Sequence, residues 1–263
     1  MFFINTLTIV ALFILSLIVP VTSFILPVYK IKKMKNLTFR SKILANLLAI
    51  IIIAIISPKL LIIYFIFFML IEIIYYYFNN IRTSVKTFDR IVITTIAVTL
   101  TMGIFTYSIR EEFIKDIQYV MNVYKANFNL NHAEVLEIFK YMKENALYYL
   151  FDYSMLSIFF TYICLDLKNY QKWNVSFEWL LVYIIPFFII HIFKIDNFYI
   201  SNIMNIGEVI FTFYGIKTAY SFFMKYIKFN VLSNFMAFGL AILFPFASFL
   251  IGVLGAFKTT KNN

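Results

Sequence analysis

Glu208 and Lys217 lie inside one otherwise apolar stretch of the sequence, residues 201–226, which is long enough to cross a bilayer as a helix. A charged side chain in hydrocarbon costs at least about 2.5 kcal/mol, so it is retained where it faces a bundle interior or a cavity. A carboxylate in that position can coordinate a cation, carry a proton or bind the amine of a solute. The alternative is a structural carboxylate, protonated or paired with a neighbouring helix.

Polar and small residues recur along the same stretch at helical spacing. Asn205, Glu208, Thr212 and Gly215 follow one another at steps of three, four and three residues, which places them on one helix face. We expect this face to line a binding site for a small solute. Lys217 lies nine residues after Glu208, about 900° around the axis, so the two charges point to opposite sides and need separate partners.

Two further polar residues inside apolar runs are secondary candidates. Glu72 lies about two turns before the end of the run 60–78, where it either lines a site or reaches the interface beside Tyr75. His191 lies near the end of the run 179–193 and is either a ligand or a hydrogen-bonded packing residue. Because the chain has two histidines and one cysteine, we expect no metal site and no cofactor.

Catalytic motifs are missing from the sequence. It contains no phosphate-binding glycine loop, no nucleophile elbow and no H-E-x-x-H motif. Glu111-Glu112 and the spacing from Phe187 to His191 are similar to motifs of intramembrane CAAX-type proteases, but Asp116 stands where that motif has an arginine. We therefore expect that the protein is not an enzyme.

The composition indicates an integral membrane protein. Of the 263 residues, 62% are hydrophobic and 14% are charged, whereas soluble domains are about half apolar and a quarter charged. The net charge of +10 comes from lysines and arginines at the ends of apolar runs, which is typical of cytoplasmic loops and anionic headgroups. We therefore expect the lipid bilayer, and not nucleic acid, as the partner of the basic residues.

The apolar runs predict an all-α transmembrane bundle of about eight spans, forming one integral membrane domain over residues 1–263. Six cations and no acid between residues 30 and 42 mark a cytoplasmic loop, which places the N-terminus outside. The run 43–56 would cover only about 21 Å, which leaves a re-entrant segment open as an alternative. The expected spans are residues 2–29, 43–56, 60–78, 91–108, 147–167, 179–193, 201–226 and 231–257.

Residues 109–146 differ in character, because they mix acids and bases with two apolar stripes at helical spacing. Asn131 followed by Glu134 resembles a capping box, so a second helix should begin near His132. We expect an amphipathic helical hairpin at the membrane surface. The first stripe is Phe113, Ile117, Val120, Met121 and Tyr124, and the second is Val135, Ile138, Phe139 and Met142.

The order of features in residues 109–257 resembles that of a known family. A polar helix pair precedes a span, and a short basic loop, Leu167 to Tyr170, leads to an aromatic-rich span with Pro186. The polar stripe from Asn205 to Gly215 then precedes a last span that ends in Gly255. This order resembles the YybS-like family of bacterial integral membrane proteins, whose function is undefined. Ala256 departs from the pattern, since the family usually has an acidic residue there.

That family is similar in topology to the S components of energy-coupling-factor vitamin transporters. The resemblance implies a location in the bacterial inner membrane and a role in binding or moving a small solute, with ATP hydrolysis supplied by another chain. S components dock a partner membrane subunit through a face of small residues, and Ala45 and Ala49 provide an Ala-x-x-x-Ala spacing here. The alternative is a non-transporting scaffold or partner-regulating protein that acts through the hairpin at 109–146.

Overall fold

The structure, a computed structural model, is helical throughout the part of the chain that it describes, and no strand occurs there. Four helices are long and apolar enough to cross a membrane, or up to five if one bent pair is counted as a span. The prediction of an all-α chain with several membrane-spanning helices is confirmed to this extent, but the number of eight spans is not. The described residues are 2–112, 114–115, 118–120, 123, 132–195 and 197–260.

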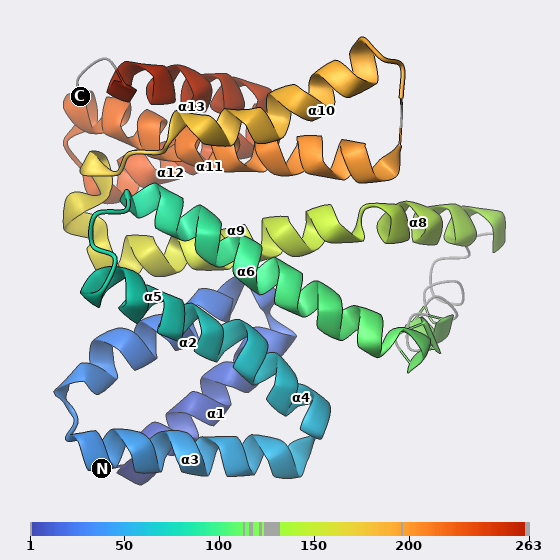
Figure 1. The fold of residues 1–263 in the computed structure, drawn as a ribbon. Coiled ribbons are helices and arrows are strands. Elements are labelled where there is room, and N and C mark those ends of the chain that lie inside the picture. Colours follow the sequence, from blue (N-terminus) through green and yellow to red (C-terminus); the bar gives the residue numbers. More distant parts are fainter. Residues whose placement is uncertain are drawn as a thin grey trace.

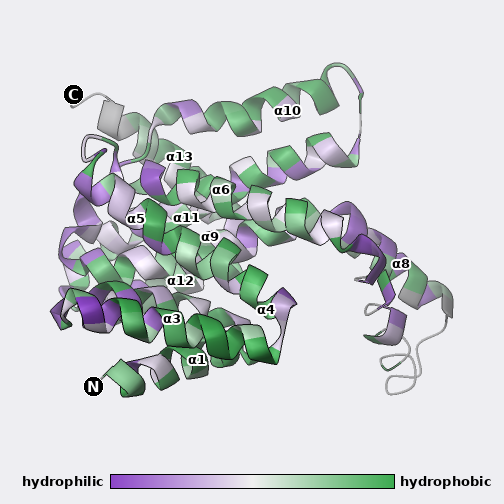
Figure 2. Ribbon diagram, turned by 60° about the horizontal axis from the view of Figure 1, so that its bottom comes forward, coloured by the Kyte–Doolittle hydropathy of each residue, from purple (hydrophilic) through white to green (hydrophobic). Residues whose placement is uncertain are grey.

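The four candidate spans lie in the first two thirds of the chain, and Figure 2 shows hydrophobic residues along them. The second of them includes a π-helical segment, η4, between two α-helices. The spans are α3 (Phe39–Ile56), α4–η4–α5 (Pro58–Ile63, Tyr64–Met69 and Leu70–Asn80), α6 (Thr87–Ser108) and α9 with η5 (Ala146–Asp166 and Leu167–Lys172).

Helix α3 begins four residues earlier than the sequence predicted, at Phe39 rather than Ile43. Thr38 is the N-cap, and its hydroxyl oxygen accepts a hydrogen bond from the Ser41 backbone N–H. This cap satisfies one of the unpaired donors of the first turn and extends the helix to 18 residues, about 27 Å. Helix α3 is therefore long enough for a full span, which removes the reason for a re-entrant segment.

The first predicted span, residues 2–29, is broken after Ile18. Helix α1 covers Phe2–Ile18, and Pro20 then begins a 3₁₀ turn, η1 (Pro20–Phe24), because proline cannot donate the backbone hydrogen bond of a continuing helix. Short segments follow in close succession before α3. They are α2 (Ile25–Val28), the π-helical turn η2 (Tyr29–Lys33) and the 3₁₀ turn η3 (Met34–Asn36).

The C-terminal third also departs from the predicted spans. Residues 231–257 form two helices bent by 116° at a break before Pro245, not one span. Helix α11 covers 30 residues as one unbroken helix, but it is not among the candidate spans, since polar residues lower its hydropathy. These helices are α10 (Leu181–His191, preceded by η6, Phe177–Leu180), α11 (Phe198–Ile227), α12 (Asn230–Leu243) and α13 (Pro245–Thr260).

The helices form three layers in Figure 1, with α1 to α5 on one side, α6 and α9 in the middle, and α10 to α13 on the other side. Phe159 of α9 lies at the centre of the aromatic core. Its ring makes edge contacts with Phe88 of α6 and with Phe213 of α11, at centroid distances of 6.2 and 5.1 Å. The middle layer is thus joined to the C-terminal layer by packed aromatic rings.

Helix α8 (His132–Glu144) begins where the sequence predicted a second helix. It continues in the direction of α9 and extends beyond the other helices (Figure 1). Ile138 and Met142, from its apolar stripe, are exposed. Phe113, Ile117, Met121, Tyr124 and Asn131 lie outside the described residues, so the predicted hairpin is not confirmed.

Candidate functional site: a buried ion pair between η2 and α5

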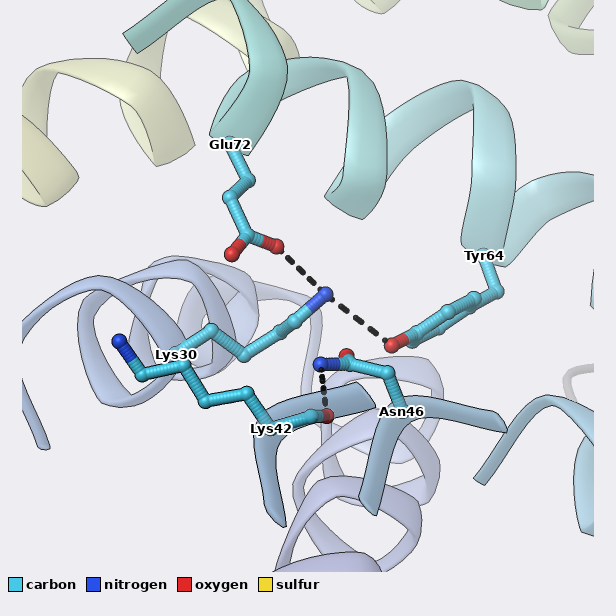
Figure 3. Close-up of polar contacts among 5 residues, drawn as sticks. All are labelled: Lys30, Lys42, Asn46, Tyr64 and Glu72. Carbon is cyan, nitrogen blue, oxygen red and sulfur yellow. Dashed lines mark hydrogen bonds and ion pairs between the residues drawn. The ribbon is translucent and has the colours of Figure 1, made fainter. Parts of the chain in front are cut away.

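A lysine and a glutamate from separate segments form a buried ion pair in the N-terminal layer. The Lys30 ammonium lies 2.5 Å from a carboxylate oxygen of Glu72. It also donates a hydrogen bond of 3.3 Å to the Tyr64 hydroxyl and lies 5.3 Å from the centre of that ring. Figure 3 shows the ammonium between the other two groups. One cation is therefore bound by an anion, a hydroxyl and an aromatic face.

Two π-helical segments supply members of this cluster. Lys30 lies in η2, two residues after the end of α2, and Tyr64 is the first residue of η4. Glu72 follows in the first turn of α5. π-helical turns are rare and occur frequently at functional sites, because the wider turn changes where side chains point. Two such turns therefore contribute residues to this one cluster, Lys30 from η2 and Tyr64 from η4.

The two partners differ in how far they are covered. The Lys30 side chain is 1% exposed, whereas that of Glu72 is 20% exposed. Removing either charge from water costs several kcal/mol, which the mutual attraction offsets only with good geometry and additional hydrogen bonds. The covered lysine meets this requirement through Glu72 and Tyr64. The carboxylate is therefore the more exposed end of the pair.

Asn46 of α3 completes the polar cluster. Its amide nitrogen donates to the Lys42 carbonyl oxygen at 2.9 Å. Its carbonyl oxygen, Oδ1, is buried and has no hydrogen-bond partner among the described residues. In Figure 3 this amide lies beside the Lys30 ammonium and the Tyr64 hydroxyl, while the Lys42 ammonium points away. An unsatisfied buried acceptor costs about 1–3 kcal/mol, so its retention in the site needs an explanation.

Glu208, the first candidate from the sequence, is half-buried in α11. Its carboxylate lies near enough to the phenols of Tyr148 in α9 and Tyr183 in α10 to interact with them electrostatically. Among the described residues, no cationic group lies within ion-pair distance of it. Asn205, one turn earlier, is also half-buried. The structure therefore gives Glu208 tyrosine neighbours and no countercharge.

Thr212 and Gly215, the other members of the predicted polar stripe, lie in the contact between α11 and α13. The Ser248 hydroxyl donates to the Thr212 carbonyl oxygen at 3.0 Å. A Cβ atom added to Gly215 would overlap the Ser248 backbone. Similarly, a Cβ on Gly252 would overlap the Phe211 carbonyl oxygen. This half of the stripe serves close helix packing in the structure.

Lys217 is buried, with 7% of its surface exposed. Its ammonium lies 5.4 Å from the centre of the Tyr214 ring, and no carboxylate lies within ion-pair distance among the described residues. Glu208 and Lys217 are therefore not paired, in line with their opposite positions around the helix.

His191 is exposed. Its ring stacks on the Phe187 ring at a centroid distance of 4.2 Å, and its Nδ1 lies 3.0 Å from the Phe187 carbonyl oxygen. These contacts correspond to the packing interpretation.

Ala45 and Ala49, the predicted docking face for a partner subunit, are completely buried inside the chain. Helix α1 packs against α3, and the Thr6 hydroxyl donates to the Ala45 carbonyl oxygen at 3.3 Å. The close approach that small residues permit is thus used within the protein. A partner helix could reach these alanines only if α1 moved away.

Sequence reasoning missed Lys30, Tyr64 and Asn46, and it ranked Glu72 as secondary. Lys30 was counted with five other cations of the basic segment, and nothing in that count separates it from the rest. Its one distinguishing signal is its position directly after an apolar run, with Pro27 three residues before it.

Asp89 was also missed. It is buried and accepts hydrogen bonds from the Ser176 N–H, the Ser176 hydroxyl and the Trp179 indole N–H, at 2.8, 2.5 and 3.1 Å.

No family model, no characterised protein and no solved structure matches this chain. The resemblance to the YybS-like family therefore stays a hypothesis. In the part of the chain that the structure describes, no three histidine, cysteine, aspartate or glutamate residues are grouped so that they could hold a metal ion. The Lys30 cluster contributes a cation, a carboxylate, a phenol and an amide, which are groups that form hydrogen bonds and ion pairs.

Proposed function

We propose that this chain is a multi-pass membrane protein that binds or moves a small polar solute, and that the solute binds at the cluster of Lys30, Asn46, Tyr64 and Glu72. The observation that carries this proposal is the buried ion pair between η2 and α5, inside an apolar bundle. Ionisable residues within a membrane are rare, and they mark substrate and ion pathways more often than they serve packing.

The energetics of the pair support a functional role. A buried ion pair contributes little net stability, because desolvation of both charges offsets most of their attraction. Hydrophobic residues of similar volume would stabilise the bundle as well or better. The cluster in addition retains a buried acceptor without a partner, Asn46 Oδ1. These features fit a site whose polar groups serve a ligand.

The resemblance to the YybS-like family adds the cellular setting of the proposal. It favours the bacterial inner membrane and a binding role similar to that of an S component, with energy supplied by another subunit. Glu208, which lies near Tyr148 and Tyr183, is with Asn205 the second candidate position for a solute. The Lys30 cluster ranks first because it combines both charges with an unpartnered acceptor.

Retention of a co-purified solute tests this function. Wild-type protein, Lys30→Met, Glu72→Gln and Glu112→Gln would be purified in lipid nanodiscs and examined by native mass spectrometry for bound small molecules. Glu112→Gln is the matched control, since Glu112 pairs with Lys59 on the surface, where both side chains are more than half exposed. We expect wild type and Glu112→Gln to retain the same amount of the solute, Glu72→Gln to lose it, and Lys30→Met to retain a different amount.

Circular dichroism of each variant would show that the helices are intact. Equal retention of one solute by wild type, Glu72→Gln and Lys30→Met would contradict the proposed site. Loss from Glu112→Gln as well would attribute the effect to general destabilisation.

A second function, that of a scaffold for a partner protein, is favoured by the position of α8. This helix extends beyond the other helices (Figure 1) and carries Lys140 and Lys143 next to exposed apolar residues. The double change Lys140→Glu/Lys143→Glu should then remove a co-purifying protein partner and leave solute retention unchanged. Unchanged recovery of the partner would contradict this alternative.

A further inference from the structure

We infer that the solute bound at the Lys30 cluster carries a primary ammonium group, and that the Lys30 ammonium occupies the same position as a tethered competitor. The inference rests on the proposed function and specifies its ligand class. It follows from which polar atoms of the cluster are already used, which are not, and which end of the pair is accessible.

The unused capacity of the cluster consists of acceptors. Asn46 Oδ1 is buried and has no partner among the described residues. Of the two carboxylate oxygens of Glu72, the ion pair uses Oε2, and an ionised carboxylate accepts at both oxygens. A ligand that satisfies these atoms must donate hydrogen bonds. A fully ionised carboxylate or phosphate ligand could not do so, because it only accepts.

The accessible charge is negative. Glu72 is 20% exposed, whereas Lys30 is 1% exposed beneath it. A ligand entering from outside the cluster therefore meets the carboxylate before the ammonium. Because opposite charges attract over several ångströms in a medium of low dielectric constant, this order favours a cationic ligand over an anionic one.

The Lys30 ammonium shows how such a ligand would be held. It is a tetrahedral cation with three donors, and it binds a carboxylate, a hydroxyl and an aromatic face at 2.5, 3.3 and 5.3 Å. The same three groups can hold a free primary ammonium, with Asn46 Oδ1 as a further acceptor. A quaternary ammonium would fit the ring face but could not donate to the oxygens.

Binding of small probe cations tests the inference. The affinities of n-butylammonium, butyltrimethylammonium and butyrate would be measured by titration calorimetry on the full chain in nanodiscs. We expect n-butylammonium to bind at least tenfold more tightly to Lys30→Met than to wild type, because the tethered competitor is gone. Glu72→Gln should lose this binding, and Glu112→Gln should match wild type.

A variant that keeps the ion pair guards against misfolding of Lys30→Met. Asn46→Leu removes the unpartnered acceptor at similar volume, and it should weaken n-butylammonium binding about threefold to tenfold relative to wild type. Equal affinity for the primary and the quaternary cation would overturn the inference, as would no gain in Lys30→Met together with no loss in Asn46→Leu.

The two proposals fail in different ways. Butyrate binding that depends on Lys30 would overturn the ammonium inference and would leave the Lys30 cluster as a solute site. If neither a probe nor the co-purified solute depends on Glu72 or Lys30, both the inference and the proposed site are wrong.

Discussion

Lys30 and Lys217 are both buried in an apolar chain, but the N-terminal and C-terminal layers accommodate them differently. Lys30 is neutralised by Glu72 from another segment and hydrogen-bonded by Tyr64. Lys217 lies over the Tyr214 ring of its own helix and has no acidic partner among the described residues. The first arrangement requires two segments to hold a fixed distance, whereas the second is local to one helix.

The surroundings of the two lysines differ in the same way. In the N-terminal layer, breaks at Pro20 and two π-helical turns interrupt the helices around the ion pair. In the C-terminal layer, α11 is unbroken over 30 residues and packs against α13 through glycines. Irregular backbone with paired charges is typical of sites, and close glycine packing is typical of scaffolds. The comparison therefore supports the proposal of a binding site in the first layer, whereas the second layer is closely packed.

The largest expected effect is on the ion pair. Glu72→Gln or Lys30→Met should lower the free energy of unfolding by about 3–5 kcal/mol, because each leaves a buried charge without a partner. The double variant Lys30→Met/Glu72→Gln should recover most of this loss. Denaturant unfolding in mild detergent, followed by tryptophan fluorescence, would measure all three. Additive losses in the double variant would show that the two residues do not act as a pair.

The next largest loss of stability is expected at the contact between α11 and α13, where Gly215 meets Ser248. Gly215→Ala should cost about 1–3 kcal/mol, because its new Cβ overlaps the Ser248 backbone and the helices must separate. Gly103→Ala is the matched control, since a Cβ there meets no atom within 4 Å. In a helix interior this control change should stabilise by about 0.5–1 kcal/mol. Thermal unfolding would compare the two, and equal effects would refute a packing role for Gly215.

A smaller loss of stability is expected at Asn202 of α11, which forms hydrogen bonds with the backbone of α8 and α9. Asn202 is buried, accepts from the Tyr148 N–H at 3.0 Å and donates to the Glu144 carbonyl oxygen at 2.8 Å. Asn202→Ala should cost about 1–2 kcal/mol, because the Tyr148 N–H and the Glu144 carbonyl oxygen lose this partner. Hydrogen exchange at residues 144–148 should rise severalfold. Unchanged exchange there would show that Asn202 does not hold these backbone groups.

The smallest effect is expected at Lys217. Lys217→Met should raise the free energy of unfolding slightly, by less than about 1 kcal/mol. The reason is that it removes a buried charge that no anion among the described residues offsets. The same unfolding assay as for Lys30→Met would give the direct comparison. A loss as large as that of Lys30→Met would mean that Lys217 has a partner of equal strength, and the contrast between the layers would fail.

The class of the protein was predictable from composition, because apolar runs need no tertiary information to be recognised. The boundaries of the helices were harder to predict. The cap at Thr38 was overlooked because the basic residues around it suggested a loop, and residues 231–257 were expected to form one span, which instead breaks before Pro245. The Lys30–Glu72 pair could not be predicted, since helical periodicity places residues on a face but does not say which distant segment meets that face.

The break before Pro245 places helix α13 beside α11 instead of in line with α12. Helix α13 lies along α11, with Gly255 against Thr218, so Thr260 ends near the last turns of α11. Helices α12 and α13 have 14 and 16 residues, about 21 and 24 Å, and neither alone crosses a core of about 30 Å. The bent pair is therefore either a broken span or a re-entrant loop. An epitope fused after the last residue would lie in the compartment of the turn at Lys228 if the pair is re-entrant, and in the opposite compartment if the pair is a broken span.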